Sequence, residues 1–118
     1  MKIERGHLYT ANLNPRFGTE AGKVRPVLVV QTDLINGEHP STLVCPLTTK
    51  IQPDVEILRV HLKEGEAGLE QDSDVLMDQV RAIDNKRLKE EIGRLTKHRL
   101  AEVQEKLSIV FDIMTVQP

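Results

Sequence analysis

The hydrophobic pattern of the chain changes its period once, near residue 96. Before that point, short apolar segments rich in β-branched residues alternate with stretches of glycine, proline, asparagine and aspartate, as in strands joined by turns. After it, apolar residues recur at spacings of three and four, which indicates one amphipathic helix. Many short strands followed by a single helix predict a mainly β fold, a barrel with the helix packed across it.

Turn-forming stretches set the expected bounds of these elements. The segment Val27–Val30 is apolar without alternation, so its strand is expected to be buried on both faces. Thr96 is expected to cap the N-terminus of the helix, whose apolar stripe is expected to pack on the sheet. Strands are predicted at 5–13, 24–32, 42–48 and 55–62, short apolar segments follow at 74–84 and 92–95, and the helix covers 96–115 with Leu100, Val103, Leu107, Val110 and Met114 as its stripe.

Length and composition narrow the class of protein. The 118 residues suit one domain, spanning 1–118, and a content of 39% hydrophobic and 29% charged residues argues against disorder. Residues 1–6 hold no apolar segment of signal-peptide length and no apolar run is long enough to span a bilayer, so we expect a cytoplasmic protein without membrane contact. A net charge of −2 is not that of a general nucleic-acid binder, so any affinity for RNA must come from a local patch.

The reactive side chains argue against several chemistries. Cys45, the only cysteine, lies in an apolar segment and is expected to be buried and inert. The four histidines form no pair by spacing, so a two-histidine ribonuclease mechanism is not supported, and His7 is only a minor candidate for a general base. There is no glycine-rich phosphate loop, serine elbow or metal-ligand spacing, so we expect neither a metal nor a cofactor.

The start of the strand at 24–32 carries the first candidate for chemistry. Pro26 restricts Arg25 to an extended backbone, so the arginine is expected at a stiff strand start beside the turn-rich loop 14–23. A guanidinium keeps its charge and suits phosphate recognition. Considered alone, such an arginine is more often a solvated surface residue.

The end of the strand at 42–48 carries the second candidate. Thr48 closes the segment Pro46-Leu47-Thr48, where its hydroxyl is able to donate a hydrogen bond to a phosphate oxygen. Considered alone, a hydroxyl at a strand terminus is more often the cap of a turn.

Taken in order, these segments resemble the MazF/PemK toxin family. The similarity covers about residues 5 to 110 and is most specific where Arg25-Pro26 is followed by Pro46-Leu47-Thr48. His7 departs from the family, in which an acidic residue commonly follows the preceding glycine. Other family-like residues are Gly6, Tyr9, Pro15, Gly18, Glu20, Lys23, the run from Val27 to Gln31, Asn36, and the runs from Asp78 to Asp84 and from Ile92 to Leu95.

The resemblance implies an SH3-like barrel of about five to seven strands with a C-terminal amphipathic α-helix, assembled as a homodimer. It implies a sequence-specific endoribonuclease acting on single-stranded RNA. It also implies an antitoxin whose acidic, flexible tail covers the RNA groove, with operator DNA reached through that antitoxin. The family's catalytic arginine and threonine fall on Arg25 and Thr48. The residues that the resemblance places near substrate are Phe17, Thr19, Glu20, Asn36 and Gln79.

The reaction that the resemblance implies needs no metal. The ribose 2′-hydroxyl attacks the adjacent phosphate, which leaves a 2′,3′-cyclic phosphate and a 5′-hydroxyl. Arg25 would supply fixed positive charge and Thr48 a hydrogen bond. Glu20 is an alternative general base, reached by closure of its loop, because a guanidinium is a poor base at neutral pH.

Two other interpretations remain open at this point. One is a non-catalytic toxin similar to CcdB, which would bind a topoisomerase through its helix. The other is an SH3-like interaction module for a peptide or DNA. Discrete RNA fragments formed in the presence of EDTA would favour the nuclease over the first, and a lack of growth arrest on expression would favour the second.

Overall fold

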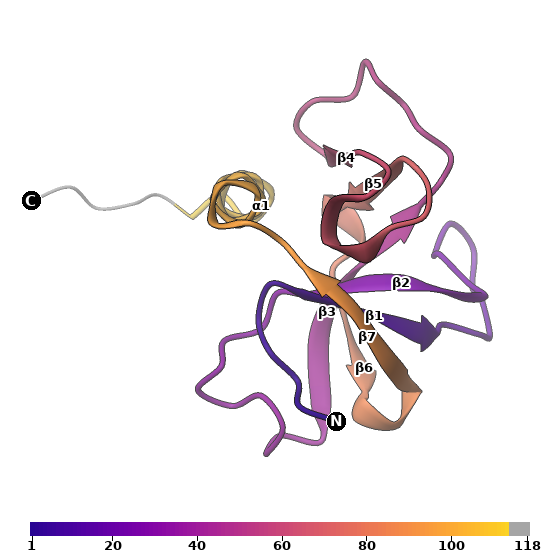
Figure 1. The fold of residues 1–118 in the computed structure, drawn as a ribbon, viewed down its shortest axis with the longest axis vertical. Helices are drawn as coiled ribbons and strands as arrows, with labels where there is room; N and C mark the ends of the chain where they lie inside the picture. Colours follow the sequence, from indigo (N-terminus) through magenta and orange to yellow (C-terminus); the bar gives the residue numbers. More distant parts are fainter. Residues whose placement is uncertain (114–118) are drawn as a thin grey trace, which may run out of the picture.

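The computed structural model describes residues 1–113, in which seven strands and one α-helix form the predicted mainly β fold (Figure 1). None of the helices in this part of the chain is long and apolar enough to cross a membrane. The strands are β1 (His7–Asn12), β2 (Val24–Val29), β3 (Ser41–Thr48), β4 (Arg59–Leu62), β5 (Ser73–Leu76), β6 (Arg81–Asp84) and β7 (Leu88–Arg94). The helix is α1 (Lys97–Val110), and short 3₁₀ turns are η1 (Glu66–Gly68), η2 (Met77–Gln79) and η3 (Asn85–Arg87).

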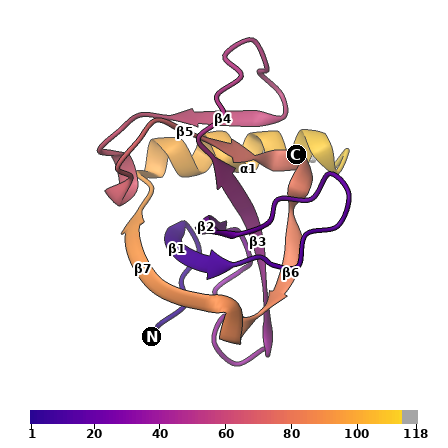
Figure 2. The same cartoon turned by 90° about the vertical axis from the view of Figure 1, so that its right-hand side faces the viewer.

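All strand pairs are antiparallel, and the strands follow the order β4-β5-β3-β2-β1-β7, with β6 paired to β3 off this path. The first half of β3 therefore pairs with β6, its middle with β2 and its end with β5. Figure 2 shows β7 curving around the outside of the sheet and leading up to α1. The sheet is bent far enough to enclose side chains, as a small barrel requires.

Alternate residues of the central strands enter two different hydrophobic cores. Leu8 and Leu28 belong to the core beneath α1, while Tyr9, Val27 and Val29 belong to the other core. Side chains alternate across a strand, so an apolar run without alternation fills both sides at once. The burial on both faces that was predicted for Val27–Val30 is confirmed for Val27–Val29, while Val30 is only partly buried. The predicted burial of Cys45 is confirmed too, and it raises the pKa of the thiol to about 12.

Two glycines let the turn η1 lie directly on β7. A Cβ atom at Gly68 would collide with the backbone of Ile92, and a Cβ atom at Gly93 would collide with the backbone of Ala67. Gly68 also has a φ of +78°, which residues other than glycine rarely adopt. This backbone contact joins the β4–β5 part of the sheet to β7.

The helix begins as predicted and ends earlier than predicted. The Thr96 hydroxyl oxygen accepts a hydrogen bond from the backbone N–H of Arg99 at 3.2 Å, so the N-cap is confirmed. Val103 is fully buried on the core side. The prediction that the helix continues beyond residue 110 is wrong for 111–113, because Asp112 adopts a φ of +54° and the chain leaves the helix there. Met114, predicted on the apolar stripe, lies outside the described residues.

Several strand bounds also differ from the prediction, among them that of β7, which was expected at 92–95 and spans Leu88–Arg94. β2 stops at Val29 instead of residue 32, because a side-chain hydrogen bond replaces the backbone pairing with β3 there. The side chain of the buried Gln31 accepts this hydrogen bond from the Leu43 backbone N–H at 3.3 Å. β4 starts at Arg59 instead of residue 55, because 49–58 forms a loop tied to buried polar groups, described below. The alternating burial expected for this strand is present from Arg59 to Leu62.

Candidate active site

Arg25 and Thr48 line one hollow of about 300 Å³ at the edge of the barrel. Their meeting follows from the sheet register. β2 and β3 are antiparallel with Val27 opposite Pro46, and continuing this register by two residues sets Arg25 opposite Thr48. The hollow is also lined by Lys23, Val24, Pro26, Leu47, Thr49, Lys50 and Ser73.

The guanidinium of Arg25 is held by two backbone carbonyls. Its Nε donates to the Gly22 oxygen at 2.7 Å, and its Nη1 donates to the Leu47 oxygen at 3.1 Å. Its Nη2 donates to no atom of residues 1–113, so it remains available for a ligand. Burial lowers the pKa of Arg25, and the nearby charge of Arg16 lowers it further. The arrangement fixes a guanidinium that has two of its donors already bonded to the backbone.

Thr48 combines both roles considered for it. Its hydroxyl oxygen accepts a hydrogen bond from the Lys50 backbone N–H at 3.1 Å, which caps the turn after β3. Because the oxygen is the acceptor in that bond, its own hydrogen stays free to donate. The side chain is partly exposed to the hollow, so a phosphate oxygen is able to reach it.

The loop 14–23 carries three of the predicted substrate residues, and Gln79 holds that loop. Gln79 accepts from the Ala21 N–H at 2.8 Å and donates to the Thr19 carbonyl at 3.2 Å. The side chains of Phe17, Thr19 and Glu20 are exposed, with 67% of Phe17 accessible. They stand beside the hollow on its loop and do not line it.

Asn36 is the one predicted site residue that the fold of a single chain places elsewhere. Its side chain donates to the Gln31 carbonyl at 3.0 Å and to the Asp33 carboxylate at 2.9 Å. It borders a separate hollow near the N-terminus with Lys2 and Glu4. Within one chain it therefore acts as the clamp of the β2–β3 connection.

A second hollow, of about 340 Å³, continues the first. The two share Pro26, Thr49 and Ser73, so together they form one groove that runs from the Arg25–Thr48 pair along η1 towards β7. Its far end is lined by Glu90 and Ile92. A groove longer than one phosphate group suits a chain-like ligand.

Sequence reasoning missed a buried carboxylate behind this groove. Asp74, opposite Thr48 in the β3–β5 pair, is fully buried and accepts from the Gln52 N–H at 3.0 Å and from Arg59 Nη1 at 2.9 Å. His61 Nδ1 lies 2.6 Å from its other oxygen. Burial alone would raise the pKa of Asp74, but these hydrogen bonds outweigh burial and lower it. The available signal was a pair of polar residues, Arg59 and His61, in an otherwise apolar strand.

Comparisons with known proteins agree with this geometry. Endoribonuclease EndoA of Bacillus subtilis (strain 168) is 38% identical over 109 residues, which cover 92% of this chain and 94% of that protein. The crystal structure of MazF from Deinococcus radiodurans shares 30% identity and superposes with a TM-score of 0.80, covering 96% of this chain and 99% of that one.

A mycobacterial endoribonuclease in complex with its cognate antitoxin has the same fold, with a TM-score of 0.78 at 17% identity; the match covers 97% of this chain and 99% of that one. Residues 4–111 match the family described as PemK-like, MazF-like toxin of type II toxin-antitoxin system. Since the match takes in both strands that form the Arg25–Thr48 hollow, the chain belongs to the PemK/MazF family of toxins.

Proposed function

We propose that this toxin is a sequence-specific endoribonuclease that binds the scissile phosphate of single-stranded RNA in the hollow shared by Arg25 and Thr48. That shared hollow is the observation that carries the proposal, because a fixed cation and a hydroxyl with a free hydrogen meet there. The name of the relative from Bacillus subtilis, an endoribonuclease, supports the same activity.

The proposed cleavage uses a nucleophile that the substrate itself carries. The ribose 2′-oxygen forms a bond to the adjacent phosphorus while the bond from phosphorus to the 5′-oxygen breaks. The 2′-hydroxyl gives its proton to a base and the leaving 5′-oxygen takes one from water, giving a 2′,3′-cyclic phosphate and a 5′-hydroxyl with no metal in the step. Arg25 Nη2 stabilises the charge that builds on the phosphate, and the Thr48 hydroxyl donates to one of its oxygens.

Proton transfer is assigned to a group other than Arg25. Burial and Arg16 lower the pKa of Arg25, but a guanidinium still holds its proton at neutral pH. Glu20 lies exposed on loop 14–23, which runs directly into β2. We assign the general base to Glu20, brought to the 2′-hydroxyl when this loop closes over RNA.

Sequence recognition is assigned to the same loop. The exposed ring of Phe17 is suited to stacking on an unpaired base, which single-stranded RNA presents and a duplex does not. Thr19 would contact base or ribose, and Gln79 would act by setting the position of Thr19 and Ala21. Asn36 would contact RNA only from a position away from the Arg25–Thr48 hollow of its own chain.

The proposed partners are a second copy of the chain and a cognate antitoxin. Solved relatives include a mycobacterial endoribonuclease with its antitoxin and MazE-MazF of Deinococcus radiodurans. A groove that accepts phosphates also accepts carboxylates, so an acidic antitoxin tail would compete with RNA for Arg25. Operator DNA would be bound through the antitoxin, since a net charge of −2 is not that of a general nucleic-acid binder.

The test is cleavage of a long transcript by the purified protein in EDTA, with fragment ends mapped. The unchanged protein should give discrete fragments with 5′-hydroxyl ends, and Arg25→Ala should abolish cleavage. Thr48→Val should slow it by about 10²–10³, as loss of one preorganised donor does. Thr32→Val is the matched control, because Thr32 caps its turn through the Leu34 N–H just as Thr48 does through Lys50, away from the hollow.

Normal cleavage by a folded Arg25→Ala variant would refute the assignment. Absence of fragments from the unchanged protein would instead favour a toxin that acts by binding alone, as in a CcdB-like protein or an interaction module.

A further inference from the structure

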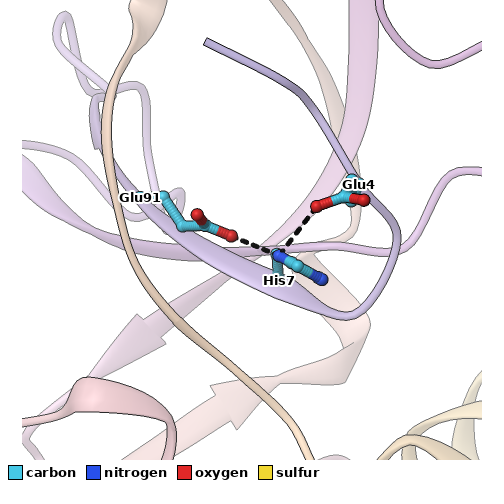
Figure 3. A group of neighbouring side chains, drawn as sticks. All are labelled: Glu4, His7 and Glu91. Carbon is cyan, nitrogen blue, oxygen red and sulfur yellow. Dashed lines mark hydrogen bonds and ion pairs between the residues drawn. The ribbon is translucent and has the colours of Figure 1, made fainter.

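A histidine and two glutamates converge at the end of β1 that lies away from the groove. His7 opens β1, Glu4 lies three residues before it, and Glu91 lies on β7, so the N-terminal segment and β7 meet here (Figure 3). One ligand atom from each side chain lies within 4.8 Å of the others. Arg25 pairs with Ala11, at the opposite end of β1, so this cluster is not part of the proposed active site.

A bulge in β7 creates the convergence. Leu8 pairs with Gly93 and Tyr9 pairs with Glu91, which leaves Ile92 as an extra residue on β7. Cross-strand partners share a face and neighbours alternate, so an unbroken register would set Glu91 on the side of Leu8, away from His7. The bulge turns Glu91 to the side of Tyr9 and His7. Bulges commonly re-aim a side chain next to a functional site.

The position of Glu4 is fixed by the core. The hydroxyl of the fully buried Tyr9 accepts from the Glu4 N–H at 2.9 Å and donates to the Lys2 carbonyl at 2.8 Å. The His7 N–H donates to the Glu4 carbonyl at 3.2 Å. These three bonds hold the segment over β1, so the carboxylate of Glu4 is brought to His7 by an ordered backbone.

Both carboxylates are directed at one ring nitrogen. His7 Nδ1 lies 3.3 Å from a Glu4 oxygen and is in hydrogen-bond contact with a Glu91 oxygen. A single N–H hydrogen makes one good bond, so it cannot serve two carboxylates equally well. A divalent cation bound by Nδ1 and one oxygen from each glutamate would satisfy all three groups and balance both negative charges. The second oxygen of Glu4 is paired with Lys2 at 3.3 Å, which leaves the first one for the cation.

We propose that Glu4, His7 and Glu91 form a binding site for Zn²⁺ or a similar first-row transition-metal dication. One imidazole with two carboxylates is a nitrogen and oxygen donor set that such ions accept, with water completing the shell. The side chains are 33%, 18% and 43% exposed, and an open hollow of about 400 Å³ beside His7 and Glu91 leaves room for that water. The bound ion clips the N-terminal segment to β1 and β7.

The test is a calorimetric titration of the full-length, untagged protein with Zn²⁺ alone. One saturable site per chain is expected, together with a metal-dependent rise in Tm of several degrees. His7→Ala should abolish the site, and Glu91→Gln should weaken it by more than about tenfold, since even outer-shell partners of a metal contribute that much. RNA cleavage in EDTA should be unchanged in His7→Ala, because His7 lies at the end of β1 opposite to the residue that pairs with Arg25.

Two matched variants exclude general metal binding. Glu90→Gln removes the neighbouring carboxylate that lines the groove instead, and His98→Ala removes an exposed histidine of α1; both should leave Zn²⁺ binding unchanged. Absence of saturable binding at millimolar Zn²⁺, or binding that survives His7→Ala, would overturn the proposal. Failure of RNA cleavage would not affect it, because titration and melting are read without RNA.

Discussion

Two loops flank the proposed catalytic hollow, and they are held in opposite ways. Loop 49–58 follows Thr48 and is tied to the fully buried Asp74 through the Gln52 N–H, with Arg59 bonded to both Asp74 and the Lys50 carbonyl. Loop 14–23 leads into Arg25, and every residue from 14 to 20 is exposed, as are those of loop 49–58 apart from Val55. Its middle is bonded to η2 through the amide of Gln79, and its ends are bonded to the guanidinium groups of Arg87 and Arg25.

The difference separates two tasks that one site must perform. Aligning a phosphate requires donors held within a fraction of an ångström, and a buried charged network supplies that rigidity. Reading different bases requires side chains able to adjust, and the exposed middle of loop 14–23 is held to η2 by the two neutral hydrogen bonds of Gln79, which open at low cost. We infer that loop 49–58, as one wall of the hollow, keeps the phosphate-binding groups aligned. Loop 14–23 determines the sequence preference.

The largest effect is expected when the buried anchor is removed. Asp74→Ala leaves Arg59 and His61 facing a site without an acceptor, and breaking such a pair costs about 3 kcal/mol of stability. Denaturant unfolding monitored by circular dichroism measures the loss. Asp78→Ala, an exposed aspartate on η2, is the control and should stay within about 0.5 kcal/mol of the unchanged protein. Equal losses in both variants would show that loop 49–58 does not depend on Asp74.

Acid should weaken the same anchor. The pKa of Asp74 lies below its ordinary value of 3.8 in the folded chain, so its contribution to stability is fully present above that value and is lost as pH falls through the folded pKa. The free energy of unfolding should therefore drop at low pH more in the unchanged protein than in Asp74→Asn. Parallel pH profiles for the two proteins would contradict this role of the carboxylate.

Removing the aromatic ring from the exposed loop should affect RNA and not the fold. Base–aromatic stacking contributes about 1–3 kcal/mol per base, so Phe17→Ala should raise KM for a short RNA by about fivefold or more while kcat changes little. Stability should change by less than about 0.5 kcal/mol because the ring is 67% exposed. Leu34→Ala, at a residue 88% exposed on another connection, is the matched control. A fall in kcat at constant KM would place Phe17 in alignment instead of binding.

The smallest expected effect belongs to Gln79. Its two hydrogen bonds are neutral and partly exposed, so Gln79→Ala should cost about 1 kcal/mol or less in stability. Hydrogen exchange at the Ala21 amide should become faster, while that at the Gln52 amide should not. Faster exchange at both amides would mean that the two walls open together.

Much of the fold could be predicted because the signals were local. The unbroken run at Val27–Val29 predicted burial on both faces, and Thr96 predicted the start of α1 from its hydroxyl alone. The start of β4 could not be predicted, because the alternation of 55–62 continues through a segment that Asp74 holds as a loop, and Asp74 lies on a later strand.

The candidate site, like the fold, could be predicted from the sequence only in part. The juxtaposition of Arg25 and Thr48 was implied by family resemblance, and the strand register explains it physically. The position of Asn36 away from the hollow depends on its bonds to Gln31 and Asp33, which spacing alone does not specify. The cluster at His7 was not foreseen, since Glu91 is brought there by a bulge between residues distant in the chain.

The position of β3 makes its length critical for the alignment of three other strands. It is bonded along its length to β6, β2 and β5 in turn, and its last residue is Thr48. Deleting or inserting a single residue within it would shift alignment against three neighbours at once and turn its side chains to the opposite face. Insertions and deletions should therefore be tolerated better in the loops on either side of the groove than in β3. The number of residues from Ser41 to Thr48 is constrained because it sets the distance between the Arg25 guanidinium and the Thr48 hydroxyl.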